Sequence, residues 1–310
     1  MGDFVINLLI SFVMPIGNLG RDLSNIADQL QSFAKLSNCE LILIVDSAPN
    51  FEIEKLRKIV KKSSNVSVIS NQFGNPGSAR NAGLAIASGT WIAFIDSDDK
   101  ADFVKFFNVT EKAESRGMNF ALGSYCLEQG GTQSKRITTN DSNEKLYKSI
   151  ARNPGIWRMV FKRNTLSTFQ FPEIKMAEDQ VFLARIGFWK LNLQISTEII
   201  YTYRKGIPGQ LTVSKTAIYD LFEAQKYTLA ILLNEENSPR DKRVLAILLS
   251  NQMLTSIRRL GVRGICFSCW TLLKPLRNFK SLDIFFLLLT TCIIEILGKF
   301  WSLLLTKRIK

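Results

Sequence analysis

The chain has 310 residues, 46% of them hydrophobic, a formal net charge of +13 and no histidine. This length is enough for a full hydrophobic core, which excludes a wholly disordered chain. Without histidine, His metal sites and Ser-His-Asp triads are excluded, so any proton transfer falls to carboxylates, Lys, Tyr or Cys. Five cysteines, an odd number, favour a reducing compartment over a disulfide framework.

The first 125 residues alternate apolar runs with helical patterns, the order of β-α-β units around a parallel sheet. We expect Pro15 to end the first strand, and that strand follows an acidic residue rather than the basic segment of a signal peptide, so no export is expected. The predicted strands are 5–14, 40–46, 66–70 and 91–96, and the predicted helices are 19–33, 51–62 and 78–87.

After residue 100 the pattern is mixed and then wholly helical. The predicted elements are a helix at 101–115, a strand at 119–127, a polar loop at 129–139, a strand at 156–162, a helix at 177–190, a strand at 193–203 and helices from 217 onward. The chain is therefore predicted to be an α/β protein, with a mixed, mainly parallel sheet flanked by helices and a C-terminal helical extension.

Three carboxylates, Asp96, Asp98 and Asp99, end the apolar run at 91–95. A continuous apolar run is typical of a strand buried on both faces, and ligands of parallel sheets bind outside the carboxyl ends of the strands. Oxygen ligands without a nearby Cys favour Mg²⁺ or Mn²⁺, which often share substrate phosphates. The alternative is a solvated acidic turn that caps the next helix.

Two other segments are expected at the same sheet edge. Asp46 closes a second apolar run and could accept hydrogen bonds from a nucleotide base, or simply cap the next segment. Arg80 follows small residues at a predicted helix start, where a guanidinium and free backbone N–H groups favour a phosphate-bearing ligand. The alternative for Arg80 is a solvated helix face.

A carboxylate pair, Glu178 and Asp179, opens the predicted helix at 177–190. The helix dipole alone explains acids at this position, but in a chain without histidine a carboxylate is also the natural general base. Tyr201, Tyr203 and Arg204 end the following strand and either clamp a substrate or cover the sheet edge.

Together these motifs resemble a known family. The strand ending at Pro15, Asp46, the segment 77–81 before 89–92, the acids of 96–99 and the triplet 178–180 occur in the order seen in family 2 glycosyltransferases of the GT-A fold. The resemblance covers residues 4–205 and implies a Rossmann-like nucleotide-diphospho-sugar transferase that moves a sugar to a hydroxyl acceptor with inversion.

The resemblance also implies residue roles. Asp96 and Asp98 would be the DXD acids that bind Mn²⁺ or Mg²⁺, and Asp179 would deprotonate the acceptor. The nucleotide-sugar contacts would be Pro15, Asp46, Arg80, Asp96, Ser97 and Asp99. One departure is the segment 47–49, Ser-Ala-Pro, where the family usually has a second Asp and Gly-Ser, which affects base recognition.

By the same resemblance, residues 1–215 form the transferase domain, with a nucleotide-sugar half (1–125) and an acceptor half (126–215), and 216–310 form the helical extension. Residues 256–310 hold ten basic and two acidic side chains beside apolar stretches, a pattern typical of an anionic membrane surface. The 22 residues 284–305 could span a bilayer once, but Glu295 and Lys299 interrupt them, so interfacial helices are expected. A helical oligomerisation surface is the alternative.

The sequence therefore favours a transferase on the cytoplasmic face of a membrane, acting in surface polysaccharide or glycolipid synthesis, with a lipid-linked glycan as one acceptor option. A nucleotidyltransferase and a catalytically inactive, basic membrane-binding protein are the alternatives. Nucleic acid is not expected as a partner, because much of the positive charge borders apolar tail segments instead of forming a stripe across a folded domain.

Overall fold

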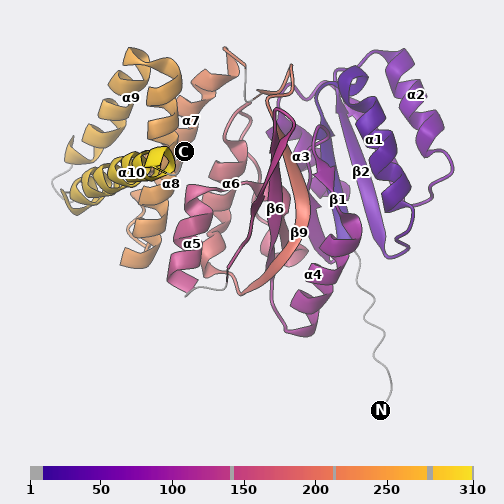
Figure 1. The fold of residues 1–310 in the computed structure, drawn as a ribbon, viewed down its shortest axis with the longest axis horizontal. Helices are drawn as coiled ribbons and strands as arrows, with labels where there is room; N and C mark the ends of the chain where they lie inside the picture. The colour runs from indigo at the N-terminus through magenta and orange to yellow at the C-terminus, as the bar shows by residue number, and fades with distance from the viewer. Residues whose placement is uncertain (1–9, 140–142, 212–213, 278–281, 309–310) are drawn as a thin grey trace.

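The structure is a computed structural model that describes residues 10–139, 143–211, 214–277 and 282–308. Over these residues nine strands form one mixed sheet in the order β3-β2-β1-β4-β8-β6-β9-β5, with β7 paired to β6. Helices cover both faces of the sheet (Figure 1). The predicted α/β class with a mixed sheet flanked by helices is confirmed.

The N-terminal strands form a parallel block. They are β1 (Ile10–Ile16), β2 (Cys39–Asp46), β3 (Val66–Asn71) and β4 (Trp91–Phe94), connected through α1 (Leu19–Phe33), α2 (Asn50–Val60) and α3 (Pro76–Ile86). Side chains of β1, β2 and β4 are buried on both faces of the sheet, which explains their continuous apolar sequences. The carboxyl ends of these strands meet at one edge.

The first strand differs from its prediction at both ends. Residues 5–9 lie outside the described part of the chain, and β1 continues through Pro15 to Ile16. The Val13 carbonyl accepts a bond from the N–H of Ile95 at 3.0 Å, so the backbone polar groups of Val13 and of every second residue along β1 point toward β4. The backbone of Pro15 points the same way, but Pro15 lies beyond Val13, the last residue of β1 that pairs with β4. The missing N–H of Pro15 therefore removes no hydrogen bond from the sheet.

The second half of the sheet is mixed. Its elements are β5 (Lys100–Ala101), α4 (Phe103–Ser115), β6 (Phe120–Gln129), β7 (Thr132–Arg136), α5 (Asn143–Arg152), β8 (Met159–Lys162), α6 (Glu178–Ile186) and β9 (Leu193–Lys205). The strand β8 is antiparallel to both β4 and β6, and β9 is parallel to β6. Consequently β4, β6 and β9 all end at the same edge of the sheet.

Three local predictions in this half were wrong. The polar loop at 129–139 contains β7, because Gly130 and Gly131, with φ of 56° and 78°, close a two-residue hairpin turn. The strand at 156–162 begins with a 3-10 turn, η1 (Ile156–Arg158). The helix at 177–190 stops at Ile186, because Gly187 turns the chain with φ of 62° before a short 3-10 helix, η3 (Phe188–Lys190).

The helical C-terminal part is confirmed. It contains η5 (Ala217–Tyr219), α7 (Asp220–Leu232), α8 (Pro239–Leu260), α9 (Val262–Leu273), η6 (Lys274–Arg277) and α10 (Leu282–Arg308). These helices stack beyond α5 and α6, on the opposite side of the sheet from α1 and α2 (Figure 1). Because Leu245 and Leu248 of α8 share a core with α5 and the sheet, the division at residue 215 stays a prediction. No helix in the described segments combines the length and apolarity needed to cross a membrane.

Candidate active site

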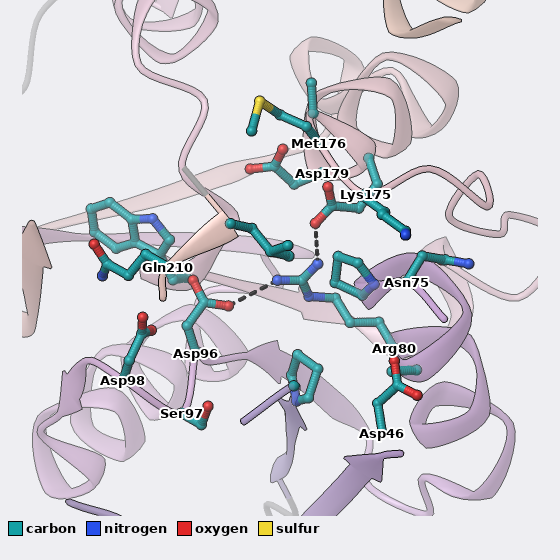
Figure 2. A pocket seen from close by; sticks show the side chains of 18 of the residues that line it. Asp46, Asn75, Arg80, Asp96, Ser97, Asp98, Lys175, Met176, Asp179 and Gln210 are labelled. Carbon is teal, nitrogen blue, oxygen red and sulfur yellow. Dashed lines mark hydrogen bonds and ion pairs between the residues drawn. The ribbon is translucent and has the colours of Figure 1, made fainter. Parts of the chain in front are cut away.

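A cavity of about 570 Å³ lies at the carboxyl edge of the sheet, between the ends of β1, β2 and β4 and the start of α6. Every site residue predicted from the sequence lines it: Pro15, Asp46, Arg80, Asp96, Ser97, Asp98, Asp99 and Asp179. Figure 2 shows that side chains from distant parts of the chain, among them Asp46, Arg80 and Asp179, surround this space. The fold thus brings together residues up to 164 positions apart in sequence, although their individual roles stay predictions.

Arg80 connects the two sides of the cavity. Its Nη1 donates to Oε1 of Glu178 at 2.5 Å and its Nη2 donates to Oδ1 of Asp96 at 2.8 Å (Figure 2). Burial alone would lower the pKa of Arg80, but the surrounding carboxylates raise it above its ordinary value. The guanidinium expected to face a ligand phosphate is therefore held by two protein carboxylates, and it ties α3 to α6 and to the end of β4.

Asp179 has the properties of a general base. Ala177, just before α6, has a left-handed backbone with φ of 63°, a strained conformation for a residue with a Cβ, and it leads directly into the carboxylate pair. Burial and the charge of Glu178 raise the pKa of Asp179 to about 7, against the opposing effects of Arg80 and a backbone N–H. A carboxylate with this pKa can accept a proton at neutral pH.

Asp96 and Asp98 are crowded carboxylates that fit a divalent cation. Burial and the charge of Asp96 raise the pKa of Asp98, while a hydrogen bond from Gln210 and the charge of Arg21, 3.4 Å away, lower it. Within the described residues, no three His, Cys, Asp or Glu side chains form a ready metal site. An ion here would therefore complete its coordination with water and ligand phosphates, as Mg²⁺ commonly does.

Ser97 and Asp99 face inward from the same loop. Ser97 Oγ donates to Oδ2 of Asp22 at 2.7 Å. The carboxylate of Asp99 accepts bonds from the Tyr201 hydroxyl at 2.9 Å and the Arg204 N–H at 2.7 Å, and its residue is 1% exposed. The bonds of Asp99 hold the acidic loop, residues 96–99, to β9, and the bond of Ser97 holds it to α1. Asp98 lies between these two residues and lines the cavity.

Asp46 organises the loop before α3. One of its carboxylate oxygens accepts bonds from the backbone N–H groups of Phe73 at 2.8 Å and Gly74 at 3.1 Å, and from the Ser47 hydroxyl at 2.8 Å. Ser47 itself has φ of 56°. The unusual segment after Asp46 therefore makes a sharp turn beside the cavity, and Asp46 shapes the wall where a nucleotide base is predicted.

Several lining residues were not predicted from the sequence. One is Trp157, which stacks with ring centroids 5.3 Å apart on Tyr203, a lining residue that the sequence analysis had singled out. Gln210 comes from the loop after β9, while Thr255 and Arg259 come from α8. An isolated Trp after a Gly-containing loop was a usable signal for Trp157, but no local pattern could have brought α8 to this edge.

Comparisons with known proteins come from sequence and from structure. A family model described as glycosyl transferase family 2 matches residues 11–172. An uncharacterised glycosyltransferase of Bacillus subtilis, EpsJ, is 26% identical over 218 residues, which are 66% of this chain and 63% of that protein. A poly(ribitol-phosphate) β-glucosyltransferase of Bacillus spizizenii is 29% identical, over 63% of this chain and 32% of its own length.

A third relative, from Escherichia coli, is WfaP, a UDP-Glc:α-D-GlcNAc-diphosphoundecaprenol β-1,3-glucosyltransferase, 33% identical over 57% of this chain and 70% of its length. The chain thus spans less than two thirds of both Bacillus relatives. Among solved structures, residues 1–349 of Staphylococcus aureus TarS with UDP-GlcNAc superpose with a TM-score of 0.71 at 18% identity, covering 94% of this chain and 92% of that one. At this identity the likeness concerns the fold, and it confirms the predicted GT-A architecture.

Proposed function

Because the chain belongs to glycosyltransferase family 2, we propose that it transfers a sugar from a nucleoside diphosphate sugar to a hydroxyl acceptor, with inversion at the anomeric carbon. The observation that carries this proposal is the convergence of Asp46, the acids of 96–98 and Asp179 in one cavity. Acids at the carboxyl ends of β2 and β4 line the same space as Asp179, a carboxylate of raised pKa, which is the arrangement that donor binding and acceptor deprotonation need.

In this mechanism Asp179 takes the proton of the acceptor hydroxyl. The acceptor oxygen attacks the anomeric carbon, the bond from that carbon to the diphosphate oxygen breaks, and its electron pair leaves with the nucleoside diphosphate. Burial and the charge of Glu178 raise the pKa of this base, and Arg80, which bonds to Glu178, lowers it. The base is ionised above its pKa of about 7, so transfer speeds up as the pH rises through that value.

We further propose that Asp98, with Asp96, binds Mn²⁺ or Mg²⁺. Arg80 occupies one oxygen of Asp96. Burial, and after it the negative charge of Asp96, raise the pKa of Asp98, and a bound cation would offset that charge. When bound, such an ion neutralises charge that builds on the departing diphosphate. Supporting this proposal, a structural neighbour with a TM-score of 0.52 and 10% identity is the mannosyltransferase PcManGT of Pyrobaculum calidifontis in complex with GDP-Man and Mn²⁺.

For the donor we propose a UDP-sugar, and for the acceptor a surface glycan or a lipid-linked glycan intermediate. The support is in the relatives: WfaP is named for UDP-Glc and a diphosphoundecaprenol acceptor, and the TarS neighbour binds UDP-GlcNAc. No feature of the cavity favours the nucleotidyltransferase alternative.

A donor assay tests the reaction itself. Purified protein is incubated with UDP-glucose and Mn²⁺, UDP release is followed, and proton NMR identifies the anomer of the first glucose released. We expect β-glucose from the α-linked donor, and a rate about 10²–10⁴ times lower for Asp179→Asn. The exposed Asp28 of α1 provides a matched control, Asp28→Asn. Release of α-glucose, or equal rates for both variants, would contradict the proposed roles.

We also propose that α9 and α10 rest on the cytoplasmic surface of an anionic membrane. Both helices expose large apolar side chains, among them Val262 at 74% and Phe286 at 57%. Basic residues surround the first of these helices: Arg258, Arg259, Arg263 and Lys274. Exposed apolar groups bordered by cations are the pattern of an interfacial helix.

Vesicle cosedimentation tests this surface. We expect the protein to sediment with phosphatidylglycerol vesicles more than with phosphatidylcholine vesicles, and the double variant Val262→Glu/Phe286→Glu to stay in solution. Phe51 of α2 is 62% exposed at the other end of the molecule, so Phe51→Glu is the matched control. Equal sedimentation of the double variant and this control would remove the basis for a membrane position.

A further inference from the structure

A second cavity, of about 380 Å³, lies between β6, β7, α5 and η1. Four cationic side chains line it, Lys135, Arg136, Lys145 and Arg158, and the described lining contains no carboxylate. The rest of the polar lining consists of hydroxyl and amide groups, from Tyr125, Thr138, Thr139, Ser149 and Asn153. In the described parts of the chain, no ion pair joins these four cations to an Asp or Glu.

Arg158 is the buried cation among the four that line this cavity. It is 6% exposed, its Nη2 donates to the Asn153 carbonyl at 3.0 Å, and its guanidinium lies 5.2 Å from the centre of the Tyr125 ring. Its Nε has no hydrogen-bond partner among the described residues. Burial lowers the pKa of Arg158 to about 10. Arg80, equally buried, has two carboxylates instead.

A buried guanidinium without an anion destabilises the protein unless a ligand compensates it. The surrounding chemistry indicates what that ligand is. Two guanidinium forks, two ammonium groups and several hydroxyl donors suit a multiply charged oxyanion better than a single carboxylate, and Arg in particular matches phosphate oxygens in pairs.

The second cavity lies close to the catalytic one. Tyr125 of its lining packs edge-on against Trp157 with centroids 4.8 Å apart, and Trp157 lines the catalytic cavity. Both β4 and β6 are antiparallel to β8, so the carboxyl half of β6 and the start of β8 belong to the same sheet edge as Asp96. The aromatic pair Tyr125 and Trp157 thus connects the walls of the two cavities.

The same cavity is coupled to the helix proposed to lie on the membrane. Arg152, at the end of α5, donates through Nε to Glu295 of α10 at 2.8 Å, and Glu295 is 6% exposed. The helix that provides Lys145 to the cavity is thus fixed directly to α10. An anion bound by Lys145 would therefore contact a helix that is paired to α10.

We propose that this second cavity binds a phosphoryl group of a lipid-linked acceptor, with Arg136, Lys145 and Arg158 as its ligands. The inference rests on the proposed glycosyl transfer and names its acceptor class. Binding the acceptor through its phosphate, next to Trp157, would direct the acceptor sugar toward Asp179.

Thermal unfolding with added phosphate tests the site independently of transfer. Full-length protein is saturated with UDP and Mg²⁺, so that the donor site is blocked, and titrated with sodium phosphate at constant ionic strength. We expect the Tm to rise and saturate. For Arg136→Ala/Lys145→Ala, at least tenfold more phosphate should be needed, and Arg158→Met should abolish the response without lowering the Tm of the phosphate-free protein.

The matched control is Lys148→Ala, because Lys148 lies on α5, pairs with Glu144 at 2.7 Å and does not line the cavity. It should respond as the unaltered protein does. An unaltered protein that ignores phosphate, or a double variant that responds normally, would overturn the site. If UDP raises the Tm and phosphate does not, the phosphate site fails and the proposed donor site stands. If phosphate raises the Tm and UDP does not, the proposed donor site fails and the phosphate site stands.

Farnesyl phosphate as a second probe identifies the source of the phosphoryl group. If it binds at least tenfold more tightly than inorganic phosphate, and Arg136→Ala/Lys145→Ala weakens it, the lipid-linked acceptor is supported. If it binds no more tightly than inorganic phosphate, the acceptor assignment is overturned and the cavity is a site for free phosphate.

Discussion

Replacing Glu178 with Gln should move the acid limb of the pH–rate profile to lower pH. Burial and the charge of Glu178 are the two largest causes that raise the pKa of Asp179 to about 7. In the variant, burial still raises the pKa of Asp179. The negative charge of Glu178 is gone, however, and the positive charge of Arg80, which lowers the pKa of Asp179, no longer has Glu178 as a charged partner. The pKa of Asp179 should therefore fall below 7, and the base should stay ionised in more acidic solution.

The size of the effect follows from the titration of one group. One pH unit below the pKa of Asp179, about a tenth of the base is ionised, so transfer by the unaltered protein at about pH 6 should run at roughly a tenth of its plateau. Each unit by which the pKa of Asp179 falls in the variant corresponds to about 1.4 kcal/mol. For each such unit, the ratio of the low-pH rate to the plateau rate should rise by up to about tenfold. The plateau itself should fall, because a weaker base removes the proton less readily.

The assay is initial UDP release at saturating donor, from about pH 5 to about pH 9, a range that brackets the expected limb. Glu173→Gln, an exposed carboxylate in the loop before α6, is the matched control and should leave the profile unchanged. Thermal unfolding should show Glu178→Gln folded but less stable by about 1–3 kcal/mol, because Arg80 loses a charged partner. If the acid limb of Glu178→Gln coincides with that of the unaltered protein, Asp179 is not the group that titrates.

Three further substitutions probe the supports of the cavity. Gly77→Ala should destabilise the protein by about 1–3 kcal/mol, since its Cβ would lie 2.2 Å from the Pro172 carbonyl, whereas Gly17→Ala, with open space, should be near neutral in thermal unfolding. Arg80→Lys should cost about 1.5–3 kcal/mol, because one ammonium cannot reproduce both bonds of the guanidinium fork, and urea unfolding measures this. Tyr201→Phe should cost about 1–3 kcal/mol and weaken UDP binding, because its hydroxyl joins a backbone N–H and a buried carboxylate of the acidic loop.

The catalytic cavity was predictable from sequence because its residues follow strands. Asp46 and Asp96 each come directly after an apolar run, and parallel strands bring such positions to one edge whatever lies between them. The pair Glu178 and Asp179 was singled out because a carboxylate is the natural general base in a chain without histidine. The choice of Asp179 as that base came from the resemblance to the glycosyltransferase family, and it stays a prediction. The positions of these residues thus follow from local patterns and the geometry of parallel sheets, whereas their roles came from the resemblance.

Long-range side-chain pairing could not be predicted in this way. The bonds of Arg80 to Glu178 and Asp96 connect positions up to 98 residues apart, and no periodicity encodes them. Arg158 gave no signal because a single Arg in an apolar segment does not reveal whether a carboxylate will meet it. The β7 hairpin was different, because the adjacent pair Gly130 and Gly131 was a turn signal in the sequence itself.

The proposed donor site is tested most directly by calorimetric titration of the full-length protein with UDP, GDP and CDP, each with Mn²⁺ and with EDTA, repeated on Asp98→Asn. We expect that UDP binds with Mn²⁺, that EDTA weakens this binding, and that Asp98→Asn abolishes its dependence on the metal. Binding of none of the three nucleotides, or UDP binding that is the same in EDTA and in the variant, would contradict a metal-dependent nucleotide-sugar site in this cavity.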